Sequence, residues 1–124
     1  MTQQKPEIDP PEGPAPSELE VTDLSVGEGT EAQAGSTVSV HYVGIAHSTG
    51  EEFDASYNRG EPLQFRLGVG QVISGWDTGV QGMRVGGRRQ LVIPPHLGYG
   101  DRGAGGAIAP GETLIFVVDL VEVR

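Results

Sequence analysis

Short stretches in which apolar and polar residues alternate, separated by glycines, most constrain the fold of this chain. Residues 38–42 and 63–67 alternate in this way, and 20 glycines are scattered through the 124 residues without a repeat. Alternation with a period of two is typical of half-buried strands, and glycines between such segments indicate tight turns. Further strands are predicted over residues 19–26 and 89–93. The segment 113–123 has few polar positions, which favours a strand in the middle of a sheet.

One segment changes to a helical period. Three apolar residues are spaced for one helix face: Trp76, Val80 and Met83. Ser74 is placed to cap this helix, with Asp77 three residues on as in a capping box. Gly79 and Gly82 limit it to about two turns, and a helix this short needs a sheet to pack against. The predicted fold class is therefore α+β, a curved antiparallel β-sheet wrapped around one short α-helix.

The N-terminal residues differ in composition from the rest. Residues 1–18 are rich in proline and acidic residues and hold too little apolar surface to offset the entropy of ordering. We expect a disordered or polyproline-II tail over 1–18 and one domain over 19–124. No apolar run reaches the roughly 20 residues that span a bilayer, and no signal peptide is recognisable. With no cysteine in the sequence, we expect a cytoplasmic protein with no membrane partner.

Several function classes fit this sequence poorly. The formal net charge of -9 argues against nucleic acid as a partner, because phosphate backbones require clustered cations. His41, His47 and His96 lack metal-ligand spacing, so no metal site is predicted. The Gly-x-Gly at residues 68–70 lacks the surroundings of a dinucleotide site, and no cofactor is expected. Aromatic residues, in contrast, gather at or beside segment ends.

The aromatic residues belong to short motifs in a fixed order. These motifs are VHYVG at 40–44, FD at 53–54, PLQF at 62–65, GQVISGWDTGVQGM at 70–83, IP at 93–94, LGYG at 97–100 and TLIF at 113–116. In order and spacing they resemble the FKBP family of peptidyl-prolyl cis–trans isomerases, from about Leu19 to the C-terminus. The resemblance implies a shallow apolar pocket between sheet and helix, and proline-containing peptides or proteins as substrates. It also implies macrolide inhibitors as ligands, and we expect a monomer.

The resemblance also implies the site residues. Trp76 would form the pocket floor, and Tyr99 and Asp54 would stand at opposite edges. The expected catalytic residues are Tyr42, Asp54, Trp76, Tyr99 and Phe116. The expected substrate-binding residues are Phe53, Arg59, Leu63, Phe65, Val72, Ile73, Ala107 and Ile108. The backbone N–H of Ile73 would bind a ligand carbonyl, and Arg59 would pair with Asp54 or with the Tyr42 hydroxyl.

The chain departs from common forms of the family at three positions. Leu63 stands where an aromatic is frequent, and Ala104 and Ala107 stand where larger residues are frequent. These changes bear on substrate preference and on macrolide affinity.

Three other functions stay open at this stage. The first is a module that binds proline segments or a partner with little turnover. The second is a general folding helper, which the short loop over 96–111 disfavours because it leaves no room for an inserted flap domain. The third is a structural β protein with an aromatic core.

Overall fold

The computed structural model describes residues 5–8, 13–100, 102–103 and 108–124. Its elements in chain order are β1 (Glu20–Ser25), β2 (Thr37–Ala46), β3 (Glu52–Ala55), the 3-10 turn η1 (Ser56–Asn58), β4 (Leu63–Arg66), the helix α1 (Ser74–Gly79), β5 (Arg88–Ile93), the 3-10 turn η2 (Pro95–Leu97) and β6 (Leu114–Val123).

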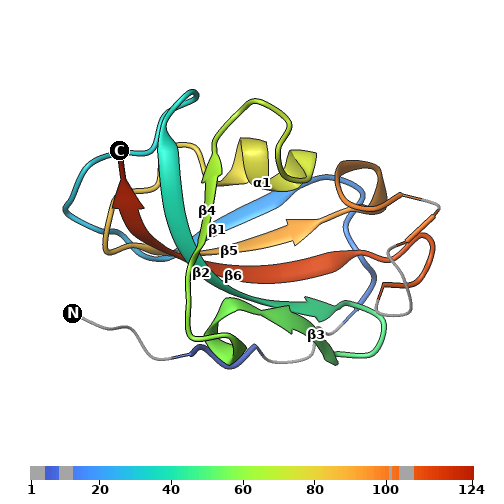
Figure 1. Ribbon diagram of the computed structural model, residues 1–124. Coiled ribbons are helices and arrows are strands. Elements are labelled where there is room, and N and C mark those ends of the chain that lie inside the picture. Colours follow the sequence, from blue (N-terminus) through green and yellow to red (C-terminus); the bar gives the residue numbers. More distant parts are fainter. Residues whose placement is uncertain (1–4, 9–12, 101, 104–107) are drawn as a thin grey trace.

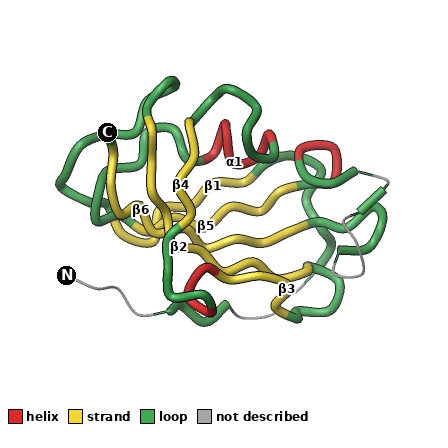
Figure 2. The backbone as a smooth tube through the Cα atoms, in the orientation of Figure 1, coloured by secondary structure: helices red, strands yellow, loops and turns green. Residues whose placement is uncertain are grey.

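The strands form one six-stranded sheet in the order β1-β5-β6-β2-β3, and β4 also pairs with β2. Every pairing is antiparallel. The first half of β2 pairs with β4 and its second half with β3, so the long β2 carries two short neighbours along the same edge. The sheet curves around α1, which lies across its concave face (Figures 1 and 2). This arrangement confirms the predicted α+β class, and β6 lies inside the sheet as expected.

The helix packs directly on the sheet through glycines. A Cβ added at Gly75 would lie 2.6 Å from the Ile93 side chain, and one at Gly79 would lie 2.7 Å from that of Leu91. Only a residue without a side chain allows this close approach. The predicted apolar face is confirmed, because Trp76, Val80 and Met83 are all buried. A helix of six residues is not stable alone, so this packing holds it.

The predicted cap of this helix was wrong. Ile73, not Ser74, is the N-cap residue, and no side chain caps it. Asp77 instead accepts hydrogen bonds from the backbone N–H groups of Gly68 and Gly70, at 2.8 and 2.9 Å. The turn before the helix folds back over the helix, and this brings those donors to the Asp77 carboxylate. The side chain therefore fixes the turn between β4 and α1.

One glycine of β2 is fixed by close packing of aromatic rings. Gly44 lies inside this strand. A Cβ there would lie 2.6 Å from the Phe116 ring and 2.7 Å from the Phe53 ring, so glycine leaves room for both rings to pack over the strand. Phe53 and Asp54 belong to β3, where Asp54 pairs with Gly44. Main-chain pairing with β2 imposes the strand.

The outer face of the sheet carries a second apolar cluster of Ile45, Val92 and Ile115, against which the partly buried Ile8 packs. Lys5 Nζ lies 2.9 Å from Glu52 Oε1 and donates to Asn58 Oδ1 at 2.9 Å. Residues 1–4 and 9–12 lie outside the described part of the chain. The division into a tail over 1–18 and a domain over 19–124 stays a prediction.

In the described residues, no helix has the length and apolar character needed to cross a membrane.

Candidate active site

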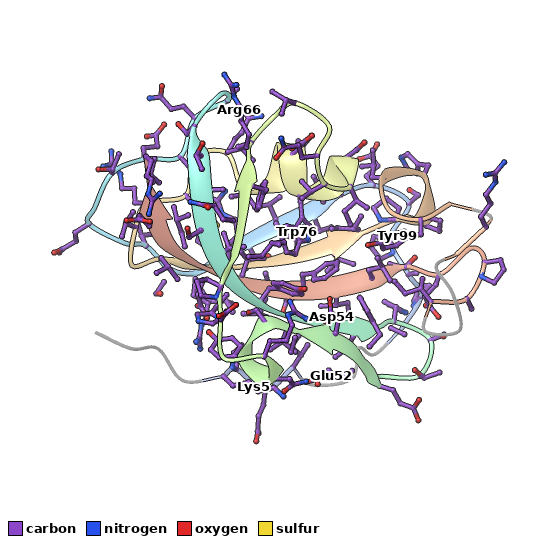
Figure 3. The ribbon with its side chains drawn as sticks, in the orientation of Figure 1. Lys5, Glu52, Asp54, Arg66, Trp76 and Tyr99 are labelled. Carbon is purple, nitrogen blue, oxygen red and sulfur yellow. The ribbon has the colours of Figure 1, made fainter. Side chains whose placement is uncertain are left out.

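A cavity of about 410 Å³ opens between α1 and the concave side of the sheet. The residues that line it come from β2, β3, β4, β6, α1 and two loops. They are Tyr42, Phe53, Asp54, Leu63, Gln71, Val72, Ile73, Trp76, Tyr99 and Phe116. Figure 3 labels three of them, Asp54 on β3, Trp76 on α1 and Tyr99 in the loop after η2. The volume falls within the usual range for small-ligand sites.

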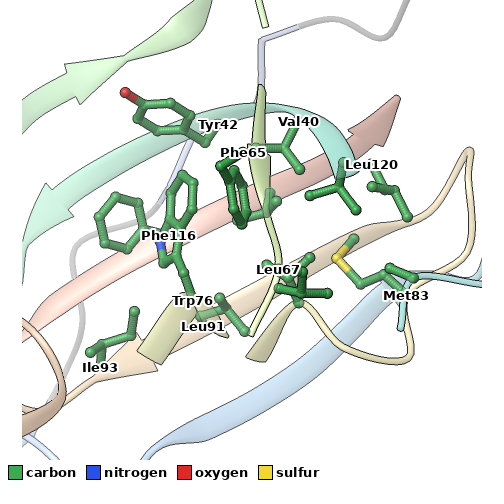
Figure 4. Packing of buried hydrophobic residues seen from close by; sticks show 14 of the residues in the cluster. Val40, Tyr42, Phe65, Leu67, Trp76, Met83, Leu91, Ile93, Phe116 and Leu120 are labelled. Carbon is green, nitrogen blue, oxygen red and sulfur yellow. The ribbon is translucent and has the colours of Figure 1, made fainter. Parts of the chain in front are cut away.

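Four aromatic rings make the floor and walls of this cavity. Trp76 meets Tyr42 with ring centroids 4.9 Å apart and Phe116 at 5.2 Å, at interplanar angles of 78° and 83°. Phe53 meets Phe116 edge to face at 5.5 Å. Edge-to-face pairs are favourable and directional, so the rings hold one another in place (Figure 4). The lining is therefore a preformed apolar surface.

The indole nitrogen at this floor has no acceptor. Among the described side chains, Trp76 Nε1 is buried without a hydrogen-bond partner. In Figure 4 this nitrogen lies on the side of the Phe116 ring. The rest of the floor and walls is formed mainly by apolar and aromatic side chains.

A polar group stands at one edge of the cavity. The Tyr42 hydroxyl donates to Asp54 Oδ2 at 2.5 Å, Arg59 Nη1 donates to Asp54 Oδ1 at 2.8 Å, and Arg59 Nη2 donates to the Tyr42 hydroxyl at 2.8 Å. Both expected pairings of Arg59 are thus present together. Burial raises the pKa of Tyr42, and the hydrogen bond to Asp54 raises it further. Burial alone would raise the pKa of Asp54, but the hydrogen bonds from Tyr42 and Arg59 outweigh it and hold that pKa below its usual range.

Two donors face the cavity from other sides. Tyr99 is 40% exposed at the rim. Burial, followed by the negative charge of Asp54, raises the pKa of Tyr99, so its hydroxyl keeps its proton. Ile73 precedes the first turn of α1, and no acceptor in the described chain takes its backbone N–H. Free N–H groups are expected at a helix start, and this one is available to a ligand carbonyl.

The structure brings together most of the residues that the sequence pointed to. Phe65 differs, because it is buried behind Trp76 with ring centroids 5.7 Å apart and is not among the described lining residues. Ile108 is likewise buried in the core, whereas Ala104 and Ala107 lie outside the described residues. The catalytic and binding roles of all these residues stay predictions.

Sequence reasoning missed Gln71, which lines the cavity. Its Oε1 accepts a hydrogen bond from the backbone N–H of Arg66 at 2.8 Å, which fixes the side chain. The signal was its position between Gly70 and Val72, in the loop that leads to the cavity floor.

The described residues contain no group of three or more His, Cys, Asp or Glu side chains that could hold a metal ion. The site thus consists of an apolar floor, an oriented polar edge and two hydrogen-bond donors.

Comparison with known families assigns the chain that forms this cavity to one of them. The sequence model of the FKBP-type peptidyl-prolyl cis-trans isomerase family matches residues 28–121. The chain belongs to the FKBP family. An FK506-binding protein of Streptomyces anulatus is 71% identical over 124 residues, covering 99% of this chain and 100% of that protein. FK506-binding protein 1A of Neurospora crassa is 50% identical over 107 residues, covering 86% of this chain and 88% of that protein.

Solved structures agree with this assignment to the FKBP family. The crystal structure of AtFKBP13 matches with a TM-score of 0.80 and 45% identity, over 89% of this chain and 96% of that one. FkpA from Escherichia coli matches with a TM-score of 0.77 and 42% identity, over 86% of this chain and 48% of that one. The resemblance seen in the motifs is confirmed, and members of the FKBP family are peptidyl-prolyl cis–trans isomerases.

Proposed function

We propose that this chain binds proline in the aromatic cavity and accelerates rotation about the preceding imide bond by favouring its twisted form. The observation that carries this proposal is the floor and walls of Trp76, Tyr42, Phe116 and Phe53, packed edge to face around a preformed opening. Membership of the FKBP family supports the same activity.

The reaction needs no nucleophile, base or cofactor. The barrier to rotation about the imide bond is about 20 kcal/mol, because resonance gives the bond partial double-bond character. Twisting the bond breaks that conjugation and removes the charge separation across it. A planar imide is therefore more dipolar than a twisted one, and an apolar surrounding disfavours the planar form more. A thousandfold acceleration requires only about 4 kcal/mol of such preference.

The polar groups of the site orient the peptide. The Ile73 N–H and the Tyr99 hydroxyl would each bind a carbonyl and hold the flanking chain in a bent shape, which prepares the bond for rotation. Asp54 is committed to Tyr42 and Arg59. Its role in this proposal is to orient the ligand and not to transfer a proton, because the reaction moves none.

Macrolides should occupy the same cavity. The relatives from Streptomyces anulatus and Neurospora crassa are named FK506-binding proteins, and we propose the same ligand for this chain. Leu63 offers the ligand a smaller apolar contact than an aromatic side chain at this position would. The remaining partners in this proposal are proline-containing peptides or proteins, bound by a monomer in the cytoplasm.

Exchange NMR on a short peptide with one Xaa-Pro bond tests the function. We expect the protein to speed the exchange between the cis and trans isomers, seen as broadened or exchanging resonances. Without the protein the isomers interconvert over tens to hundreds of seconds. FK506 should abolish the effect by filling the cavity. Peptide binding without faster exchange would contradict the proposed activity and favour a binding module with little turnover.

We also expect kcat/KM to stay flat between about pH 5.5 and 9, because the site groups do not titrate there. The lowered pKa of Asp54 keeps it ionised throughout, and the raised pKa values of Tyr42 and Tyr99 keep both hydroxyls protonated. The contribution of Asp54 to stability is present above the ordinary carboxyl pKa, and is lost as the pH falls through its lower folded value. Exchange NMR at several pH values checks the profile, and a bell-shaped curve within this window would mean that a titrating group takes part in turnover.

A further inference from the structure

A buried charged cluster lies on the outer face of the sheet, opposite the cavity. Asp119 on β6 has a side chain only 1% exposed, although it sits on a strand that is otherwise mostly apolar. It is the cross-strand neighbour of Arg88 on β5 and of His41 on β2. Arg88 Nε donates to Asp119 Oδ1 at 2.6 Å and Arg88 Nη2 donates to Oδ2 at 3.1 Å. This bidentate pair satisfies the buried carboxylate from one side.

Tyr57, in the η1 turn, joins this cluster from the other side. Its hydroxyl donates to Asp119 Oδ2, and its ring stacks on His41 with centroids 4.5 Å apart and planes 21° from parallel. Burial raises the pKa of Tyr57, and the hydrogen bond to Asp119 raises it further. The hydroxyl therefore keeps its proton at neutral pH and can donate to the carboxylate.

The turn that Tyr57 anchors also carries part of the cavity edge. Asp54 lies in the last two residues of β3, one residue before η1, and Arg59 follows η1 directly, with its N–H donating to the Ser56 carbonyl at 3.0 Å. Ser56 is fully buried, and its Oγ accepts from the backbone N–H of Tyr42 at 2.7 Å. Few residues separate the anchor from Asp54, so movement of η1 would move the carboxylate and the guanidinium together.

We infer that Tyr57 is a positioning residue for the isomerase site: its hydroxyl, held by the buried Asp119–Arg88 pair, fixes η1 and so the geometry of Asp54 and Arg59 against Tyr42. The inference rests on the proposed function, because it assigns Tyr57 a role through residues at the edge of the proposed site. The contacts link the outer face of the sheet to the cavity, from Asp119 to Tyr57, along η1, and from there to Asp54 and Arg59.

The fold does not need this hydroxyl to satisfy Asp119. The carboxylate already accepts two hydrogen bonds from Arg88, so it remains paired when the Tyr57 hydroxyl is removed. In Tyr57→Phe the ring can still stack on His41. This variant therefore removes the Tyr57 hydroxyl contact of η1, while the Ser56 hydrogen bonds to β2, the buried pair and the ring packing stay in place.

Tyr57→Phe is the test, with two readouts taken on the folded protein. We expect kcat on a proline peptide to fall by up to about tenfold, which is less than the hundredfold cost of a misplacement by a full ångström. KM should change little, because the aromatic lining is untouched. NMR titration of the Asp54 carboxyl should show its pKa rising toward the usual aspartate value, as contacts with Tyr42 and Arg59 loosen. A loss of stability alone would not produce that rise.

Val92→Ala is the matched control, because Val92 lies on the same outer face in the cluster with Ile45 and Ile115, and that cluster includes no residue of η1. It should lower the unfolding free energy without changing kcat or the Asp54 pKa. Unchanged kcat and Asp54 pKa in Tyr57→Phe would overturn the inference, as would equal changes in Val92→Ala. If the unmodified protein showed no isomerase activity, the proposed function would fail, and the Asp54 titration would still decide whether Tyr57 positions this carboxylate.

Discussion

Replacing Phe116 by alanine should lower kcat/KM on a proline peptide by about 100-fold, equivalent to about 2.7 kcal/mol of transition-state stabilisation. The Phe116 ring meets those of Trp76, Tyr42 and Phe53 edge to face, at 5.2, 6.1 and 5.5 Å between centroids. Its removal opens the wall of the cavity and admits water to the imide bond. In water the planar and twisted imides are both solvated, so the preference for the twisted form is lost. Exchange NMR with a single peptide gives the rate.

The Phe116→Ala protein must remain folded for its kinetics to be interpreted. A Phe→Ala change in a core costs about 3–5 kcal/mol, so the kinetics should be measured at low temperature and corrected for the folded fraction. Phe116→Leu keeps more of the volume and should lose activity less steeply. Ile115→Ala is the matched control, because Ile115 is 3% exposed and its side chain packs on the opposite face of the sheet. It should lose stability while keeping kcat/KM.

A variant that removes the Asp54 carboxylate distinguishes the apolar mechanism from proton transfer. Asp54→Leu should lower activity by less than Phe116→Ala and should not abolish it, because in the proposed mechanism Asp54 orients the ligand and donates no proton. An Asp54→Leu protein that is folded but shows no turnover would contradict the mechanism. Full activity in Phe116→Ala would contradict it as well, since the wall would then contribute nothing.

The strands that could be predicted are those in which apolar and polar side chains alternate along the sequence. In β4, Leu63 and Phe65 alternate with Gln64 and Arg66, and the pattern alone places the strand. The strand β3 has one large apolar residue, Phe53, beside acidic neighbours, and its extended form comes from pairing with β2. A short strand of this kind is set by its partner, which local sequence does not reveal.

The helix likewise has one feature that could be predicted from the sequence and one that could not. The phase of Trp76, Val80 and Met83 was predictable because one apolar face must meet the sheet. The bonds of Asp77 were not, because they depend on a turn that brings Gly68 and Gly70 back over the helix. Within the site, the motifs located most of the lining through the family resemblance. The position of Phe65 behind Trp76 could not be read from the sequence, because an aromatic beside the pocket and one behind it look alike there; its binding role stays a prediction.

The burial of Asp119 could not be predicted from the sequence, and it leads to a large expected change in stability. In the sequence Asp119 is one of the few polar residues of an apolar segment, whereas its side chain is enclosed between Arg88 and Tyr57. We expect Asp119→Ala to lower the free energy of unfolding by about 3–5 kcal/mol, because it removes one partner of a buried ion pair. Urea unfolding followed by Trp76 fluorescence measures the change, read as a shift of the midpoint at constant slope.

Most of that cost should come from the groups left behind and not from the lost attraction. Arg88 Nε and Nη2 lose the carboxylate that they engage, and the Tyr57 hydroxyl loses its acceptor. The combined variant Tyr57→Phe, Arg88→Met and Asp119→Leu removes every member of the set and fills the space with apolar groups. Such replacements are often neutral or stabilising, so the triple variant should be more stable than Asp119→Ala alone. A triple variant as unstable as the single one would show that the charged pair itself stabilises the sheet.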